Sequence, residues 1–159
     1  MGKTLLFNPG PTNVAEEVRQ ALITPDICHR EPEFFEVLKR VNQNLIKILN
    51  GEGTHSAVHF VSSGTGCNEA VISSIHGKVL VVNNGQYSDR LCEIAERLVV
   101  PVTRLVFDPL QPIAVPKIEE ELKRDPEITH ILLVHHETTT GALAPLRAIG
   151  ELAARYGKL

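Results

Sequence analysis

The sequence predicts an α/β fold built on a mostly parallel sheet with helices on both faces. From residue 57 onward, short apolar runs alternate with helical segments and short loops. Strands that alternate with helices in this way pair in parallel through right-handed crossovers. The runs VLVV at 79–82 and ILLV at 131–134 contain no polar residue. Continuous apolar runs of this kind are typical of strands that are covered on both faces.

The first part of the chain is expected to form an arm and two helices. Residues 5–14 contain a Pro-Gly-Pro run, which predicts an extended arm. A helix is expected over 15–22, with two glutamates in its first turn, where negative charge is favourable. A longer helix is expected over 32–49, because apolar residues recur there at spacings of three and four. The pair Asn50-Gly51 should end it.

The alternation fixes the order of the remaining elements. Four strands are expected, each followed by a helix. The strands are 57–61, 78–82, 101–107 and 129–134, and the helices are 68–75, 87–98, 116–124 and 146–156. We therefore divide the chain into an N-terminal arm with two helices, residues 1–50, and an α/β part, residues 51–159.

Composition and charge exclude several classes of partner. The net charge of −3 gives no general attraction to nucleic acid or to acidic membranes. No apolar run approaches the roughly 20 residues that span a bilayer, and the first residues do not have the long apolar core of a secretory signal. The three cysteines are odd in number and have no redox or metal spacing, so we expect reduced thiols in a cytoplasmic protein.

The histidines do not form a metal-site pattern. His55 and His59 are four residues apart, but they fall around a predicted strand, where that spacing does not bring side chains together. His135 and His136 are adjacent, and on a strand they would point to opposite faces. No metal site is expected.

Ligands of an open parallel sheet bind beyond the carboxyl ends of its strands, so the loops there are the candidate site. The loop with Ser63, Gly64 and Thr65 lies between a predicted strand and a helix. A helix start offers free N–H groups and partial positive charge, which suit a phosphate group. Ordinary helix capping is the alternative, since Ser, Thr and Gly are normal capping residues.

Two further loops follow strands on the same edge. Tyr87 opens a predicted helix, where its ring would stack on a flat heterocycle or pack against a neighbouring loop. Residues 138–140 are three threonines, whose hydroxyls would bind a ring substituent unless they only prolong the strand into a turn. Glu137 is expected to hold this loop by accepting backbone N–H bonds, and the role of a general acid or base is the alternative. Together the three loops describe a pocket for a flat, phosphorylated, hydroxylated ring.

The order of the motifs resembles that of the class V aminotransferases. The motifs are LLFNPGPTNV, DICHREPEF, SSGTGCNEAV, VVNNGQYSDR and HHETTTGALAPL. These enzymes have the fold of aspartate aminotransferase, known as fold type I, and use pyridoxal 5′-phosphate (PLP). Within the class, the likeness is greatest to the group acting on 2-aminoethylphosphonate and pyruvate. The serine/alanine–glyoxylate and –pyruvate aminotransferases are the alternative.

The resemblance implies a role for each site residue. Residues 51–159 would be the first part of the PLP-binding large domain, and the cofactor phosphate would bind to Ser63, Gly64 and Thr65. The ring would lie against Tyr87 and its phenolic oxygen would meet Thr139. The substrate pocket would be bordered by Gly10, Pro11, Thr12 and Arg30. A surface ion pair remains the alternative role of Arg30.

The implied reaction is transamination, with 2-aminoethylphosphonate as amino donor and pyruvate as acceptor. None of the seven lysines matches the family's Schiff-base position, so no catalytic residue is expected in this chain and it should be inactive alone. The rest of the large domain and the C-terminal small domain would be absent. Expected partners are a second copy in a full-length homodimer, or a complementing C-terminal chain. A flavodoxin-like module that binds a phosphate ligand is the competing hypothesis.

Overall fold

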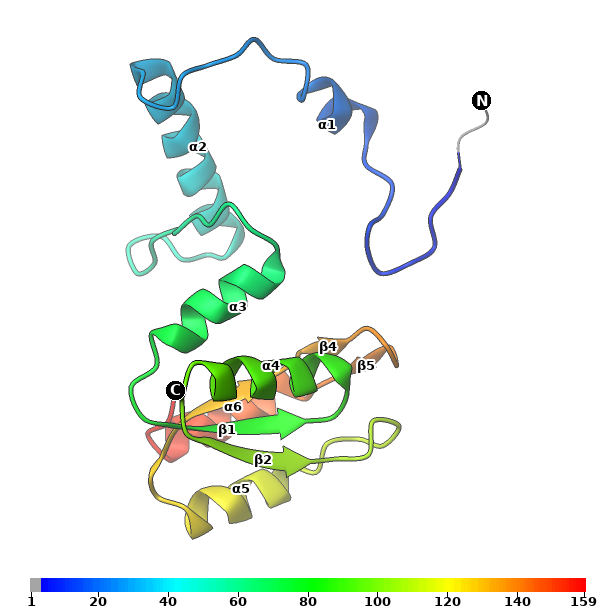
Figure 1. The fold of residues 1–159 in the computed structure, drawn as a ribbon, viewed down its shortest axis with the longest axis vertical. Coiled ribbons are helices and arrows are strands. Elements are labelled where there is room, and N and C mark those ends of the chain that lie inside the picture. The colour runs from blue at the N-terminus through cyan, green and yellow to red at the C-terminus, as the bar shows by residue number, and fades with distance from the viewer. Residues whose placement is uncertain (1–3) are drawn as a thin grey trace. The chain divides into compact units, whose positions relative to one another are not determined.

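The computed structural model describes residues 4–159 (Figure 1). The chain divides into two compact units, one ending at His59 and the other running from Phe60 to Leu159. Each unit is described by itself. Within the described residues, no helix combines the length and the apolar content that crossing a bilayer requires.

The first unit contains two helices, α1 (Glu16–Gln20) and α2 (Pro32–Ile48), which confirms both expected helices, with α1 shorter than expected. Pro32 is the first helical residue of α2, where its missing N–H costs no hydrogen bond. The helix ends before Asn50, which has a φ of 50°, a left-handed conformation that is common after a helix. Neither helix has a buried residue.

The second unit is built on a parallel sheet, as expected, but the sheet has three strands and not the four that were predicted. Its strands are β1 (Lys78–Asn83), β2 (Val102–Val106) and β3 (Ile128–Leu133), in the order β2-β1-β3. Its helices are α3 (Gly64–Ser73), α4 (Gln86–Arg97), α5 (Val115–Arg124) and α6 (Leu146–Arg155). The central strand β1 is buried from its second residue to its last.

The helices cover both faces of the sheet, which confirms the expected layers. Val79 and Val81 of β1 pack with residues of α3 and α4 in one cluster. Leu80 and Val82 point to the opposite face and pack with residues of α5 and α6. Alternate residues of a strand face opposite sides, so an unbroken apolar run is what a strand covered on both faces requires. Each such buried side chain contributes about 1.5–3 kcal/mol.

The expected strand at 57–61 is wrong, since these residues form no strand. Val58, Phe60 and Val61 are exposed, and within residues 4–159 no strand pairs with them. An apolar run becomes a strand only where a neighbouring strand takes up its backbone hydrogen bonds. The helix expected at 68–75 begins earlier, at Gly64, so the residues assigned to a loop form its first turn.

A short hairpin follows β3, where the sequence predicted only a loop. Strands β4 (His136–Glu137) and β5 (Ala142–Leu143) pair in an antiparallel manner. The turn between them carries the three threonines, and Gly141 closes it with a φ of 77°, a value that L side chains rarely adopt.

The outer edge of β3 is partly engaged by Leu159. The N–H of Leu159 donates to the carbonyl of Thr129 at 3.0 Å, and the N–H of Ile131 donates to the carbonyl of Leu159 at 2.8 Å. This pair of bonds is the pattern that a parallel neighbour makes. The edge of β3 therefore has the geometry to take a parallel strand.

Candidate functional site

One carboxylate joins the loops that follow β1 and β3. Glu137 is fully buried, and its Oε2 accepts the backbone N–H of Tyr87 at 3.1 Å. Its Oε1 accepts the backbone N–H of Thr139 at 3.3 Å and the hydroxyl of Thr139 at 2.6 Å. The expectation that Glu137 holds the loop by accepting N–H bonds is confirmed. Tyr87 and Thr139, 52 residues apart in sequence, are thus held by the same side chain.

Gly85 makes room for that carboxylate. A Cβ on Gly85 would lie 2.7 Å from the carboxyl group of Glu137, closer than two such atoms approach. The first turn of α4 is fixed independently by Ser88, whose Oγ accepts the N–H groups of Asn84 and Gly85 at 2.9 and 3.0 Å. Tyr87 is 53% exposed, so this residue is accessible to a ligand.

A buried acceptor in the same loop has no partner. Asn84 is only 3% exposed, and its Oδ1 receives no hydrogen bond within the part of the chain that the structure describes. Leaving such an atom unsatisfied costs about 1–3 kcal/mol. The loop that presents Tyr87 therefore has an open position for a hydrogen-bond donor.

The start of α3 is open to a ligand. No side chain caps it, so the N–H groups of its first residues have no partner inside the helix. A Cβ on Gly64 would meet no atom within 4 Å, whereas a Cβ on Gly66 would collide with Ser62. Gly66 thus allows the chain to turn tightly into the helix, and Gly64 leaves the outer side of this turn free.

The three loops begin on one side of the sheet. Figure 1 shows α3 and α4 both starting on the right, the side on which β1 ends. The two helices also pack against each other through the cluster that contains Ile72 and Leu91. Hydrogen bonds join the loops of Tyr87 and Thr139, but within residues 60–159 none joins either of them to residues 63–65.

The expected substrate residues all lie in the first unit and are exposed. The arm around Gly10, Pro11 and Thr12 is held by its own side chains. Asn8 Nδ2 donates to the carbonyl of Pro11 at 2.7 Å, and Asn13 bonds the backbone of Leu6 and Thr4 at 2.8 and 2.9 Å.

Arg30 precedes α2 and makes no ion pair within residues 4–159. The surface ion pair that was its alternative role is not formed there. Its guanidinium is available to an anionic ligand.

The shifted pKa values belong to groups that hold the fold. A hydrogen bond from Lys78 lowers the pKa of Asp125 and raises that of Lys78 itself. A hydrogen bond from Tyr156 lowers the pKa of Glu119. These two contacts join the start of β1 to the end of α5, and α5 to α6, so they brace the sheet rather than serve its ligand-facing edge.

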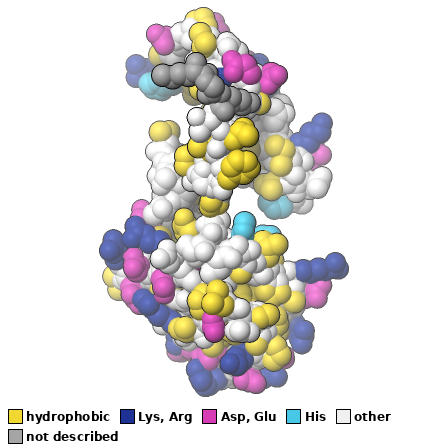
Figure 2. All heavy atoms as spheres, turned by 90° about the vertical axis from the view of Figure 1, so that its right-hand side faces the viewer, with side chains coloured by type: hydrophobic (Ala, Val, Ile, Leu, Met, Phe, Trp, Pro, Cys, Tyr) yellow, Lys and Arg dark blue, Asp and Glu magenta, His cyan; other side chains and the backbone are white. Residues whose placement is uncertain are grey.

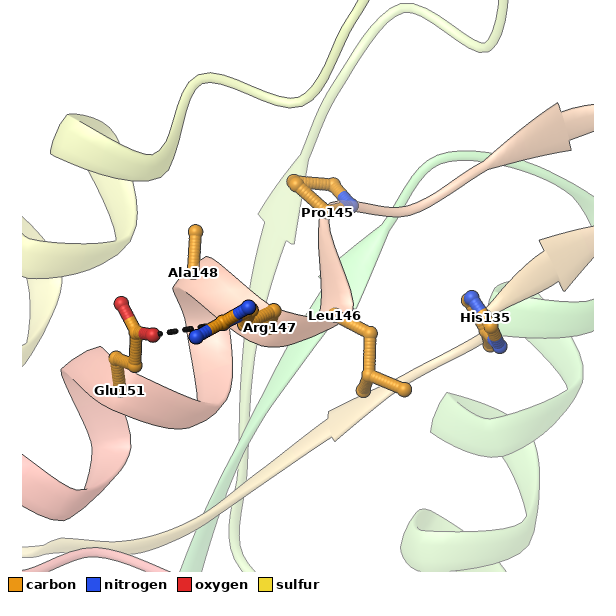
Figure 3. A pocket seen from close by; sticks show the side chains of 6 residues that line it. All are labelled: His135, Pro145, Leu146, Arg147, Ala148 and Glu151. Carbon is orange, nitrogen blue, oxygen red and sulfur yellow. Dashed lines mark hydrogen bonds and ion pairs between the residues drawn. The ribbon is translucent and has the colours of Figure 1, made fainter.

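A separate hollow lies beside the start of α6. It has a volume of about 580 Å³, is wide open to solvent, and is lined by His135, Pro145, Leu146, Arg147, Ala148 and Glu151. Figure 3 shows that Arg147 points to Glu151 on the same helix, and the two form an ion pair at 3.1 Å. Because its one cation is already paired and none of the expected site residues lines it, this hollow is not the candidate site.

The described surface is partly apolar, and no cluster of metal ligands is found among the described residues. Figure 2 shows hydrophobic side chains at the surface of both units, and the exposed residues of the second unit include Val106, Leu110 and Leu143. No three or more His, Cys, Asp or Glu side chains among the described residues are placed to hold a metal ion. The described surface thus offers apolar and hydrogen-bonding contacts rather than a metal centre.

The sequence of the chain is similar to those of known aminotransferases. The model of the aminotransferase class-V family matches residues 4–159. The 2-aminoethylphosphonate–pyruvate transaminase of Pseudomonas aeruginosa is 39% identical over 157 residues, which are 97% of this chain and 42% of that protein. The protein of the same name from Bacillus cytotoxicus is 34% identical, over 98% of this chain and 43% of its own length. The chain thus spans about two fifths of the length of these relatives.

Solved structures of aminotransferases share the fold. The ureidoglycine–glyoxylate aminotransferase of Bacillus subtilis has a TM-score of 0.85 at 27% identity, over 96% of this chain and 40% of its own. An aspartate aminotransferase from Thermus thermophilus has a TM-score of 0.86 at 28% identity, over 98% of this chain and 44% of its own. The predicted likeness to the aspartate aminotransferase fold is confirmed.

Proposed function

Because the chain belongs to the class-V aminotransferases, we propose that it binds PLP at the strand ends of its second unit. The protein would use PLP to transfer the amino group of 2-aminoethylphosphonate to pyruvate. The observation that carries the proposal is the link made by Glu137, which holds Tyr87 and Thr139 at neighbouring strand ends. This is the edge at which an open parallel sheet binds ligands.

The residues present fit a flat phosphorylated ring. The free N–H groups of Gly64 and Thr65 and the positive end of α3 suit the phosphate, and the hydroxyls of Ser63 and Thr65 add donors. The half-exposed ring of Tyr87 suits stacking on a heterocycle. The exposed Thr139 suits a hydrogen bond to a ring substituent.

Each group has a separate task in the proposed reaction. The start of α3 anchors the phosphate, so that the ring can only pivot about that point. Tyr87 limits the pivot by covering one face of the ring. When bound, PLP supplies an electron sink that lets the amino group leave its donor. The protein's own contribution is to hold the ring and to keep water from its covered face.

The choice of amino donor is supported by the curated relatives. Proteins named 2-aminoethylphosphonate–pyruvate transaminase match at 34–39% identity over nearly the whole chain. The donor would leave as phosphonoacetaldehyde, and pyruvate would become alanine. A glyoxylate-dependent aminotransferase is the second candidate, because enzymes of that kind from Bacillus subtilis and Nostoc share the fold at 25–27% identity.

The first unit would supply the substrate contacts. We assign the border of the substrate pocket to Gly10, Pro11 and Thr12, and the anionic group of the substrate to Arg30, which makes no ion pair among residues 4–159. The apolar face of α2 would be covered by a second copy of the chain, because α2 has no buried residue of its own. The exposed apolar side chains of this face are Val37, Val41, Leu45 and Ile48.

A binding experiment tests the cofactor assignment without requiring catalysis. The probe is 4-deoxypyridoxine 5′-phosphate, which keeps the ring and the phosphate but has no aldehyde to react with a lysine. Replacing Ser63 and Thr65 by Ala should weaken its binding by roughly a hundredfold or more, since each hydrogen bond to a charged group contributes about 1.5–3 kcal/mol and 1.4 kcal/mol is a factor of ten. The control replaces Ser73 and Ser74, at the opposite end of the same helix, and should leave affinity unchanged.

The reaction is tested by measuring alanine formed from pyruvate and each amino donor. If this protein is one half of a split enzyme, alanine should form only after it is mixed with a second chain that supplies a reactive lysine. If the control variant at Ser73 and Ser74 lost as much affinity for the probe as the variant at Ser63 and Thr65, the phosphate site would be refuted. Alanine formation with L-serine but not with 2-aminoethylphosphonate would refute the donor.

A further inference from the structure

A buried carboxylate without a cation stands at the centre of the strand-end loops. Glu137 is 0% exposed and forms no ion pair within residues 4–159. A buried charge is costly unless other groups compensate it. Its compensation comes from two backbone N–H groups and one hydroxyl, those of Tyr87 and Thr139. The carboxylate is therefore committed entirely to fixing the geometry of the two loops.

The first loop is fixed through the start of a helix. Tyr87 is the second residue of α4, where backbone N–H groups lack intrahelical partners and negative charge is favoured. Glu137 thus caps α4 from another segment of the chain. Gly85, directly before the helix, has no side chain to keep the carboxylate away. The direction in which the Tyr87 ring leaves the backbone depends on this contact.

The second loop is fixed through the direction of a hydroxyl. A threonine hydroxyl has one proton to donate and lone pairs that accept. The hydroxyl of Thr139 donates its proton to Oε1 of Glu137, at 2.6 Å, because a carboxylate can only accept a hydrogen bond. While this bond is kept, the exposed side of Thr139 Oγ1 presents lone pairs and binds a group that donates.

We propose that Glu137 is a positioning residue that aligns Tyr87 with Thr139 and makes the Thr139 hydroxyl a hydrogen-bond acceptor. The inference rests on the proposed function, since the ligand is the PLP ring. It adds that the ring is recognised at Thr139 through a group that carries a proton, namely its protonated ring hydroxyl. Glu137 itself touches no ligand.

The test measures two quantities that a merely structural role would not move together. The first is hydrogen exchange at the amides of Tyr87 and Thr139. The second is the affinity ratio between 4-deoxypyridoxine 5′-phosphate and its 3-O-methyl ether, which has no ring proton to donate. The parent chain should prefer the hydroxyl form by roughly tenfold, the value of one good hydrogen bond.

Three variants separate the steps of the inference. Glu137→Gln should speed exchange at the Thr139 amide and reduce the ratio, because the NH2 group of Gln cannot accept that N–H and can donate to the Thr139 hydroxyl and turn it around, while the remaining oxygen still accepts from Tyr87. Thr139→Val keeps the size of the side chain and should bring the ratio close to one, whereas Thr139→Ser should preserve it. Glu121→Gln is the matched control, because Glu121 is also buried but pairs with Arg124 on α5.

The outcomes distinguish the inference from the function on which it rests. Failure of the parent chain to bind either probe would refute the proposed function, and with it the role of Thr139. Binding with a ratio that persists in Thr139→Val would show that size alone excludes the ether, which overturns the inference and leaves the function intact. Unchanged exchange at the Thr139 amide in Glu137→Gln would overturn the positioning role whatever the binding results.

Discussion

Adding one methyl group at Gly85 should destabilise the second unit through Glu137. The new Cβ would lie 2.7 Å from Cγ, Cδ and Oε2 of Glu137, a side chain that is fully buried and cannot swing into solvent. Overpacking of this kind costs about 1–3 kcal/mol, and lengthened hydrogen bonds to the carboxylate add to it. We expect Gly85→Ala to lower the free energy of unfolding by about 2–3 kcal/mol.

The same chemical change at Gly150 should have the opposite sign. Gly150 lies inside α6, and a Cβ there would meet no atom within 4 Å. Alanine is favoured over glycine in a helix interior by about 0.5–1 kcal/mol. Urea unfolding followed by far-ultraviolet circular dichroism gives both values. If Gly85→Ala proved as stable as the parent chain, the close packing of the carboxylate against Gly85 would be refuted.

Two further predictions concern groups that brace the fold. The pair of Lys78 and Asp125 contributes stability above the ordinary carboxyl pKa and below the ordinary ammonium pKa, between about pH 4 and pH 10. The contribution is lost as pH falls through the lowered pKa of Asp125 or rises through the raised pKa of Lys78. The free energies of unfolding of the parent and of Lys78→Met should therefore differ most near neutral pH and converge at both extremes of pH. Burial raises the pKa of the Cys92 thiol, whereas Cys28 and Cys67 are exposed; a thiol reagent should therefore label two cysteines quickly and the third only on unfolding, and rapid labelling of all three would contradict the packing of α4.

The parallel sheet could be predicted because its signal is local. In β1 the apolar run is long enough to name a strand, and the absence of polar residues in the run indicates that both faces are covered. A similar run ends β3, after Thr129 and His130. The error at 57–61 has the same origin. Its composition matches that of a strand, but composition cannot say whether a pairing partner exists, and within residues 4–159 none does.

The candidate site could be predicted only in part, because its centre depends on a contact between distant segments. Tyr87 and Thr139 were recognisable from their places after strands. The reason for a glycine at position 85 was not, since nothing near Gly85 in sequence indicates that Glu137 will lie against it. The unpaired Oδ1 of Asn84 is likewise visible only when the surrounding atoms are placed.

The contact also changes how the site residues should be understood. Tyr87 and Thr139 would be treated from sequence as two independent contributions to one pocket, whose effects on binding add. Because a single carboxylate holds both, a change that moves Glu137 alters the ring contact and the hydroxyl contact at once. Effects of residues that share a partner are not additive. The physical unit of this site is therefore the Glu137 carboxylate with the two loops bound to it, in addition to the bonds that Ser88 makes within the first loop.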